Sequence, residues 1–369
     1  MASMAPVASA QYHFVAMLTP TGASKLLSWI SGWTTVFAWQ ANVASVGYLT
    51  ATQIQALIVL NNESYVYERW HGTMMFWAVV VVSTLVNVLG IRILPHLETA
   101  VVILHVCLWI RRGEEVENAA LTVPRSMVLS LIINGLLGFG FLIGLLFSVT
   151  DIEGALNSPT KSPVVEILYQ ALQSKPATTA VVSLFVVVFV CIEMGMVAST
   201  SRLTWAFARD NGLPFSKYFA HVNPHYKIPL RAILLNALIA MLLNLINIAS
   251  STAFSAVLSL TTISLYCSYM LPIAIMVLQR MRKDQLNFGP FTLGQFGLVI
   301  NVIGLLWGVF IVVFVVFPTE IPVTAANMNY ASLVFGSALL SIFLAWFLYG
   351  RKLFQGPINE LVEGTEALT

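Results

Sequence analysis

The sequence predicts an all-α protein, a polytopic bundle of transmembrane helices. Of its 369 residues, 58% are hydrophobic and 9% are charged, whereas an average soluble domain has roughly 25% charged residues. The mean hydropathy is +0.84. The apolar residues form long continuous runs without the two-residue alternation of a membrane β-barrel, so helices are expected. The chain should therefore use lipid as its main solvent, and a net charge of +2 is too small to suggest nucleic acid as a partner.

Eight apolar runs, uncharged except for Glu193, are long enough to cross a hydrocarbon core of ~30 Å, which takes about 20 helical residues. They cover residues 26–60, 72–90, 126–150, 176–201, 232–249, 253–279, 295–317 and 330–350. A ninth run, Thr99–Ile110, would rise only about 18 Å as a helix and is expected to be a half-helix. We therefore expect an N-terminal tail at residues 1–25, one membrane domain at 26–350 and a cytoplasmic C-terminal tail at 351–369.

Positive charge predicts the direction of the spans, because Lys and Arg collect on the cytoplasmic side of short loops. With the N-terminus inside and the run 99–110 not crossing, three of the 18 Lys and Arg residues face outward: Arg69, Lys161 and Lys175. The same arrangement puts the glycosylation sequon at Asn62 outside. If the run 99–110 crossed, Lys25 and Arg92 would move outside and Arg69 would move inside. The charges thus favour eight crossings and one half-helix.

Some shorter features carry weaker signals. The stretch Val164–Gln173 fits a short amphipathic helix on the outer surface and a plain loop equally well. Gly140 and Gly144 form a GxxxG pair typical of close helix packing, with a dimer interface as the alternative. The cysteines lie inside apolar runs, so no disulfide framework, metal site or other cofactor is predicted: Cys107, Cys191 and Cys267.

Four separated motifs resemble one family of transporters. The segments EEVENAALTVPR at Glu114–Arg125 and ASTSRLTWAFARDNGLP at Ala198–Pro214 resemble signatures of the amino acid-polyamine-organocation permeases. The segments GPFTLGQFGLVIN from Gly289 and PVTAANMNYASLVFG from Pro322 narrow the resemblance to the fungal permeases for amino acids, 4-aminobutyrate and choline. The resemblance extends from about Leu27 to Pro357.

The resemblance implies a fold of twelve helices in two inverted repeats. Its substrate site is built around broken first and sixth helices, with walls from the third, eighth and tenth. Residues 26–60 resemble the third helix, 72–90 the fourth and 99–110 the start of the fifth, and the chain then continues with the motif that follows the sixth. The first, second and sixth helices are therefore expected to be absent, leaving an incomplete inverted-repeat permease fold.

The resemblance also implies a function. A family member would be a proton-coupled secondary transporter for amino acids, 4-aminobutyrate or choline-like amines, in the plasma membrane or an internal (vacuolar) membrane. Losing the broken helices removes free backbone groups that would bind substrate. A second hypothesis therefore stays open: a transport-incompetent scaffold that associates with another permease copy. An intramembrane enzyme is disfavoured and no catalytic residue is assigned, because every Asp lies outside the spans.

Glu193 is the sole acidic or basic side chain within a predicted span. A charge at the bilayer centre costs about 2.5–3.5 kcal/mol on insertion scales, so such a residue is expected to face a cavity, pair, or stay protonated. Its nearest cation in sequence, Arg202, lies about 13 Å along the helix axis. Proton coupling and ammonium binding are the functional interpretations, and a protonated or drifted side chain is the structural one.

Other polar residues are candidates for the substrate pathway. Asn42, Ser45 and Tyr48 lie close to one face of the first span at helical spacing. Thr261 and Thr262 lie in the run that resembles the tenth family helix. Each of these residues either lines the pathway or hydrogen-bonds to a neighbouring helix, which is the commoner use of such residues in membranes.

Overall fold

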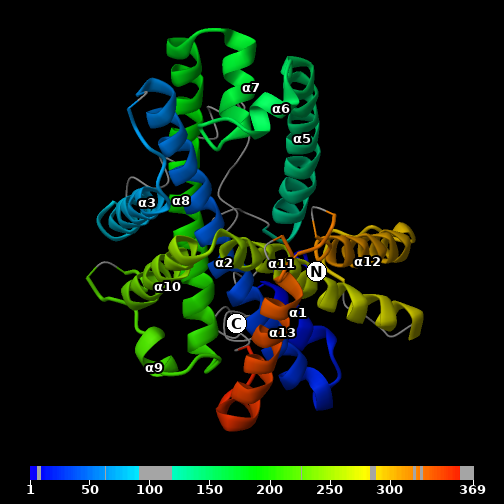
Figure 1. The fold of residues 1–369 in the computed structure, drawn as a ribbon. Helices are drawn as coiled ribbons and strands as arrows, with labels where there is room; N and C mark the ends of the chain where they lie inside the picture. The colour runs from blue at the N-terminus through cyan, green and yellow to red at the C-terminus, as the bar shows by residue number, and fades with distance from the viewer. Residues whose placement is uncertain are drawn as a thin grey trace.

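The computed structural model describes residues 1–5, 10–62, 64–90, 119–225, 227–282, 288–318, 321–324 and 327–357 as helices joined by loops (Figure 1). Eight of the described helices are long and apolar enough to cross a membrane. They are α2 (Thr21–Asn61), α3 (Arg69–Leu89), α5 (Ala119–Ser148), α8 (Lys175–Arg209), α10 (Leu230–Ala249), α11 (Ser251–Arg282), α12 (Phe296–Phe314) and the continuous segment Ala331–Leu353, which begins with α13 (Ala331–Ala345). Helix α13 continues through the π-helical turn η1 (Trp346–Gly350) into α14 (Arg351–Leu353). The all-α polytopic class is therefore confirmed.

Four shorter helices lie between or before these spans. They are α1 (Ala10–Leu18), α6 (Ile152–Leu156), α7 (Pro163–Leu172) and α9 (Ser216–Phe219). The segment that fitted either a helix or a loop is thus the helix α7, which has a proline in its first turn and ends where Gln173 takes a left-handed φ of 50°. The run Thr99–Ile110, expected to be a half-helix, lies outside the described residues.

Helix α2 is the central element of the bundle. Its 41 residues rise about 60 Å, roughly twice the thickness of the hydrocarbon core. It packs mainly against α11 and α8, and also against α1 and α3. Gly47 allows a close approach, because a Cβ atom at this position would lie 2.6 Å from the Phe76 ring of α3. The buried core around this contact includes Val43, Val80 and Val197.

An aromatic cluster joins the first part of α2 to the end of α8 and to the C-terminal helices. Trp29 is fully buried, and its indole N–H donates to the Ile342 carbonyl of α13 at 3.1 Å. Its ring lies 5.6 Å from that of Trp346 and 5.4 Å from that of Phe354, measured between centroids. Phe207 at the end of α8 packs against the same ring. The cluster therefore holds the C-terminal helices against α2 and α8.

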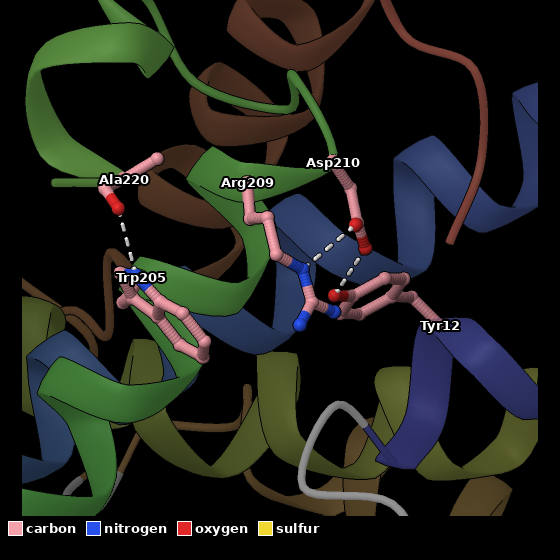
Figure 2. Close-up of polar contacts among 5 residues, drawn as sticks. All are labelled: Tyr12, Trp205, Arg209, Asp210 and Ala220. Carbon is pink, nitrogen blue, oxygen red and sulfur yellow. Dashed lines mark hydrogen bonds and ion pairs between the residues drawn. The ribbon is translucent and has the colours of Figure 1, made fainter. Parts of the chain in front are cut away.

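Residues 1–25 were expected to be a tail, but much of this segment is part of the bundle. Helix α1 packs against α2 and α11 and buries Val15 and Leu18. The Tyr12 hydroxyl donates to a carboxylate oxygen of Asp210 at 2.8 Å, and the Arg209 guanidinium lies 3.5 Å from the same carboxylate. Figure 2 shows these side chains meeting where α1 reaches the end of α8. The segment is ordered because its apolar face and this polar contact are both satisfied by other helices.

The contacts between helix ends agree with the relative placement that the charges predict. Tyr12 and Asp210, both expected inside, meet at one end of the bundle. Asn61, just past the predicted span 26–60, and Thr179, near the predicted outer end of the span 176–201, are hydrogen-bonded at 2.9 Å at another. Asn62, the sequon residue, is exposed beside them. Which end faces the cytoplasm stays a prediction.

Helix α5 stands apart from the other spans, beside α6 and α7 (Figure 1). None of its most apolar window is buried. A Cβ atom added at Gly140 or at Gly144 would meet no described atom within 4 Å. The GxxxG pair therefore makes no close helix contact within the described part of the chain.

Candidate substrate pathway

Three of the predicted pathway residues meet where α2 packs on α11. The Ser45 and Thr261 hydroxyl oxygens lie 3.4 Å apart, and Ser45 also donates to the Ala41 carbonyl at 2.9 Å. One turn further along α2, the Tyr48 ring packs edge-on against the Phe254 ring of α11, with centroids 4.9 Å apart. This α2–α11 contact combines hydroxyl groups with aromatic rings, and Ser45, Tyr48 and Thr261 are each partly exposed.

Glu193 lies on a different side of α2. Its side chain is fully buried, and a Cβ atom at Gly47 would lie 3.4 Å from its Oε1 atom. Ser45 and Gly47 are two residues apart, so they point about 200° apart around the helix. Glu193 therefore belongs to the junction of α2, α3 and α8, and the structure does not bring it to the α2–α11 contact. Among the described residues, neither of its carboxyl oxygens has a hydrogen-bond partner.

The remaining two candidates lie beside these contacts. Asn42 is partly buried, and its amide nitrogen lies 4.0 Å from the Met196 sulfur of α8. Thr262 is partly exposed next to Thr261, about 100° further round α11. Asn42 thus sits at the α2–α8 contact, and Thr262 sits at the edge of the α2–α11 contact.

A buried polar network joins α2, α8 and α10. Gln40 of α2 donates a side-chain hydrogen bond to the Asn236 carbonyl oxygen of α10. Thr204 of α8 donates to the same oxygen at 3.2 Å. Gln40 therefore uses its side chain to join helices, which is the structural role that polar residues in membranes often take.

Tyr67, in the loop between α2 and α3, was not predicted from the sequence. It is half-buried, and burial raises the pKa of its phenol, with the nearby phenols of Tyr48 and Tyr65 acting in the same direction. The phenols of Tyr67 and Tyr48 therefore influence one another electrostatically. The sequon at Asn62 predicts that the loop containing Tyr65 and Tyr67 is external. This signal does not relate Tyr67 to Tyr48, because helical spacing says nothing about a residue in a loop.

A separate cavity of about 540 Å³ lies among α1, α5, α11 and α12. Its walls include Phe14, Met127, Tyr269, Met276 and Arg280. None of the predicted pathway residues lines it. Within the described residues, no group of three or more His, Cys, Asp or Glu side chains is arranged to hold a metal ion.

This arrangement of apolar spans with polar side chains at their buried contacts defines a multi-pass integral membrane protein. A family model described as "Amino acid permease" matches residues 113–339. The chain therefore belongs to the amino acid permease family, and it is a membrane transporter.

Individual relatives extend the match over most of the chain. Amino-acid permease 2 of Neurospora crassa is 27% identical over 422 alignment positions, which cover 99% of this chain and 77% of the relative. Amino-acid permease BAT1 of Arabidopsis thaliana is 28% identical, over 97% of this chain and 82% of the relative. The choline transporter of Saccharomyces cerevisiae is 35% identical over 65% of this chain and 42% of the relative.

Proposed function

We propose that this transporter moves a small amino acid or amine across the membrane along the α2–α11 contact. The observation that carries the proposal is the pairing of the Ser45 and Thr261 hydroxyls, 3.4 Å apart, beside the Tyr48 and Phe254 rings. Hydroxyl oxygens accept hydrogen bonds from the protonated ammonium group of an amino acid or 4-aminobutyrate. Aromatic faces attract cations, including a quaternary ammonium such as that of choline, which has no N–H to donate. The relatives, two named as amino-acid permeases and one as a choline transporter, support a substrate that carries an ammonium group.

Uptake of labelled amino acids, 4-aminobutyrate and choline in permease-null cells tests this proposal. Thr261→Val removes one hydroxyl of the contact while keeping the side-chain volume, and we expect several-fold lower uptake at equal surface expression. Ser259→Ala is the matched control, because Ser259 lies two residues away on the same helix and donates to its own helix at Ser255. Equal uptake by Thr261→Val and the wild type would contradict the proposed pathway.

We also propose that transport is coupled to protons through Glu193. This carboxyl is fully buried between α2 and α8, and the described residues offer it no hydrogen-bond partner. An unpaired charge is costly to bury, so gaining or losing a proton there changes the energy of the α2–α8 contact. That contact is among the most extensive in the bundle, which gives protonation a route to the arrangement of the helices.

Proteoliposomes with an imposed pH gradient test the coupling. Glu193→Gln keeps the size of the side chain but has no proton to release, so we expect it to exchange substrate without accumulating it. Glu153→Gln, which changes an exposed carboxyl on α6, is the control and should accumulate substrate normally. Gradient-driven accumulation by Glu193→Gln at the wild-type level would refute coupling at this residue.

We further propose that the chain lacks the first, second and sixth family helices. The alignment with the N. crassa permease has 422 positions, more than the 369 residues of the chain, so that relative contains residues without a counterpart here. The exposed surface of α5 also fits a missing neighbour. Reading the transcript across the codons for Ile110–Glu115 tests the absence of the sixth helix. A message without additional codons there would support the absence. A longer message would restore the missing segment and contradict it.

A second candidate function is that of a transport-incompetent scaffold, which associates with another permease copy. Another permease copy would bury the face of α5 that has no neighbour within the described chain. In this case the chain alone gives no uptake, and its co-expression changes the uptake of a full-length relative. Robust uptake by the chain on its own would exclude this scaffold function.

A further inference from the structure

The cavity among α1, α5, α11 and α12 is separate from the α2–α11 contact, because no residue of α2 lines it. Besides these helices, it is bounded by the first five residues and by residues of the loop that precedes α12. In Figure 1 the N-terminus lies at this place, between α11, α12 and the lower end of α5. Its volume of about 540 Å³ falls within the range of about 300–1,000 Å³ that is usual for ligand sites.

The cavity follows one face of α11 for about the thickness of one leaflet. The lining residues of α11 have helical spacing: Tyr269, Pro272, Ile273, Met276 and Arg280. The distance from the first to the last of them is about 17 Å along the axis, close to half of the ~30 Å hydrocarbon core. Methionines also contribute from α5 and from the N-terminal segment, and their flexible side chains adapt to irregular apolar shapes.

Among the described residues, the single charged side chain that lines the cavity is that of Arg280, at the end of the α11 stripe. Its guanidinium carbon lies 4.9 Å from the Phe288 ring centroid, and the missing side chain at Gly297 leaves room for the guanidinium. The Arg280 Nε atom is buried, and no described residue accepts its hydrogen bond. No acidic side chain of the described chain lines the cavity, so these walls hold a cation without supplying its counter-ion.

The helices around the cavity have mostly uncovered outer surfaces. None of the most apolar window of α5 is buried, and 11% of that of α12 is buried. Both helices are candidate spans, so lipid can reach the parts of their surfaces that no described residue covers. Arg125, which follows directly after the lining residues Val123 and Pro124, is exposed.

We propose that this cavity binds one anionic phospholipid, with an acyl chain along the α11 stripe and its phosphate at Arg280. The length and apolar lining fit the chain, and the guanidinium fits a phosphate, which it can hold with two parallel hydrogen bonds. By the charge rule this is the cytoplasmic leaflet, where anionic lipids are enriched. The site is independent of the transport proposal.

Native mass spectrometry of the full chain, purified in detergent, tests the site. The protein is incubated separately with phosphatidylserine, phosphatidylcholine and oleate, and the retained lipid is counted. We expect the wild type to retain phosphatidylserine in preference to the other two. Arg280→Gln should lower this preference about fivefold, the effect expected of one arginine at an anionic headgroup. Arg282→Gln is the matched control, since Arg282 is exposed two residues further along the same helix, and it should keep the preference.

A second variant tests the apolar part of the site. Ile273→Trp places a large side chain in the stripe and should lower the retention of phosphatidylserine while the protein stays folded. It also keeps the test valid if Arg280→Gln fails to fold. An equal effect of the two arginine variants, a preference for oleate, or unchanged retention in Ile273→Trp would each overturn the proposal.

Discussion

Removing the Tyr12 hydroxyl is the sharpest test of how α1 is held in the bundle. The hydroxyl donates to the Asp210 carboxylate at 2.8 Å, and this contact joins residues 198 positions apart in the chain. Tyr12 is fully buried and Asp210 is 2% exposed. In Tyr12→Phe the ring keeps its edge-on packing against Phe207, so the variant isolates the hydrogen bond from the apolar contact.

The expected loss follows from the charge on the acceptor. A hydrogen bond to a charged group contributes about 1.5–3 kcal/mol to stability. Because the Arg209 guanidinium stays 3.5 Å from Asp210, the carboxylate keeps one favourable neighbour, and we expect the lower end of this range, about 1.5 kcal/mol. For a chain of 369 residues, such a loss lowers the melting temperature by about 2 °C.

Thermal unfolding in detergent, followed by size-exclusion chromatography of the heated protein, measures this shift. Tyr218→Phe is the matched control, because Tyr218 is 55% exposed and its ring contact with Arg231 survives the change. We expect the control to melt within a degree or so of the wild type. A Tyr12→Phe protein as stable as the wild type, or an equal loss in the control, would refute the role of this hydrogen bond.

Three further predictions follow from the packing, the topology and the titration of single residues. Gly47→Ala should cost about 1–3 kcal/mol, because the new Cβ would lie 2.6 Å from the Phe76 ring; Gly138→Ala in α5, with open space around it, should cost nothing in the same thermal assay. Asn62→Gln should abolish a glycan-dependent shift on gels, and a tag after Thr369 should be reached by antibody in permeabilised cells alone; labelling in intact cells would overturn the orientation. Burial raises the pKa of Tyr67 above its ordinary value of 10.0, so its contribution to stability is complete below pH 10 and is lost as the pH rises through the raised pKa. Tyr67→Phe should therefore flatten the fall in melting temperature above pH 10, and an unchanged alkaline profile would contradict this.

The membrane class and the eight spans could be predicted with few errors because both depend on local properties. A run of about 20 apolar residues must be helical in lipid, whatever its neighbours are. The ends of the helices were less predictable. Helix α8 continues to Arg209, past the apolar run that ended at 201, because a helix does not stop where the chain leaves the hydrocarbon. Residues 10–18 gave no span signal, so the helix α1 was missed.

The candidate site was predictable in part. Helical spacing grouped Asn42, Ser45 and Tyr48 on one face of α2. Ser45 and Tyr48 both contact α11, whereas Asn42 lies beside Met196 of α8. The spacing along α2 carried no information on Glu193, because Glu193 belongs to α8. The fold packs its side chain beside Gly47, on the side of α2 that faces away from α11. Tyr67 was missed because its proximity to Tyr48 arises from the path of a loop.

The sequence by itself determined that this chain is a membrane protein, which of its described segments are long and apolar enough to cross, and which family it belongs to, because hydropathy, helix length and linear motifs are properties of contiguous residues. The tertiary structure decided which polar side chains meet, that α1 is anchored at Asp210, and where the Arg280 cavity lies. The physical reason is that helical spacing specifies the face of a helix on which a residue lies, while the packing of the whole bundle decides what that face contacts.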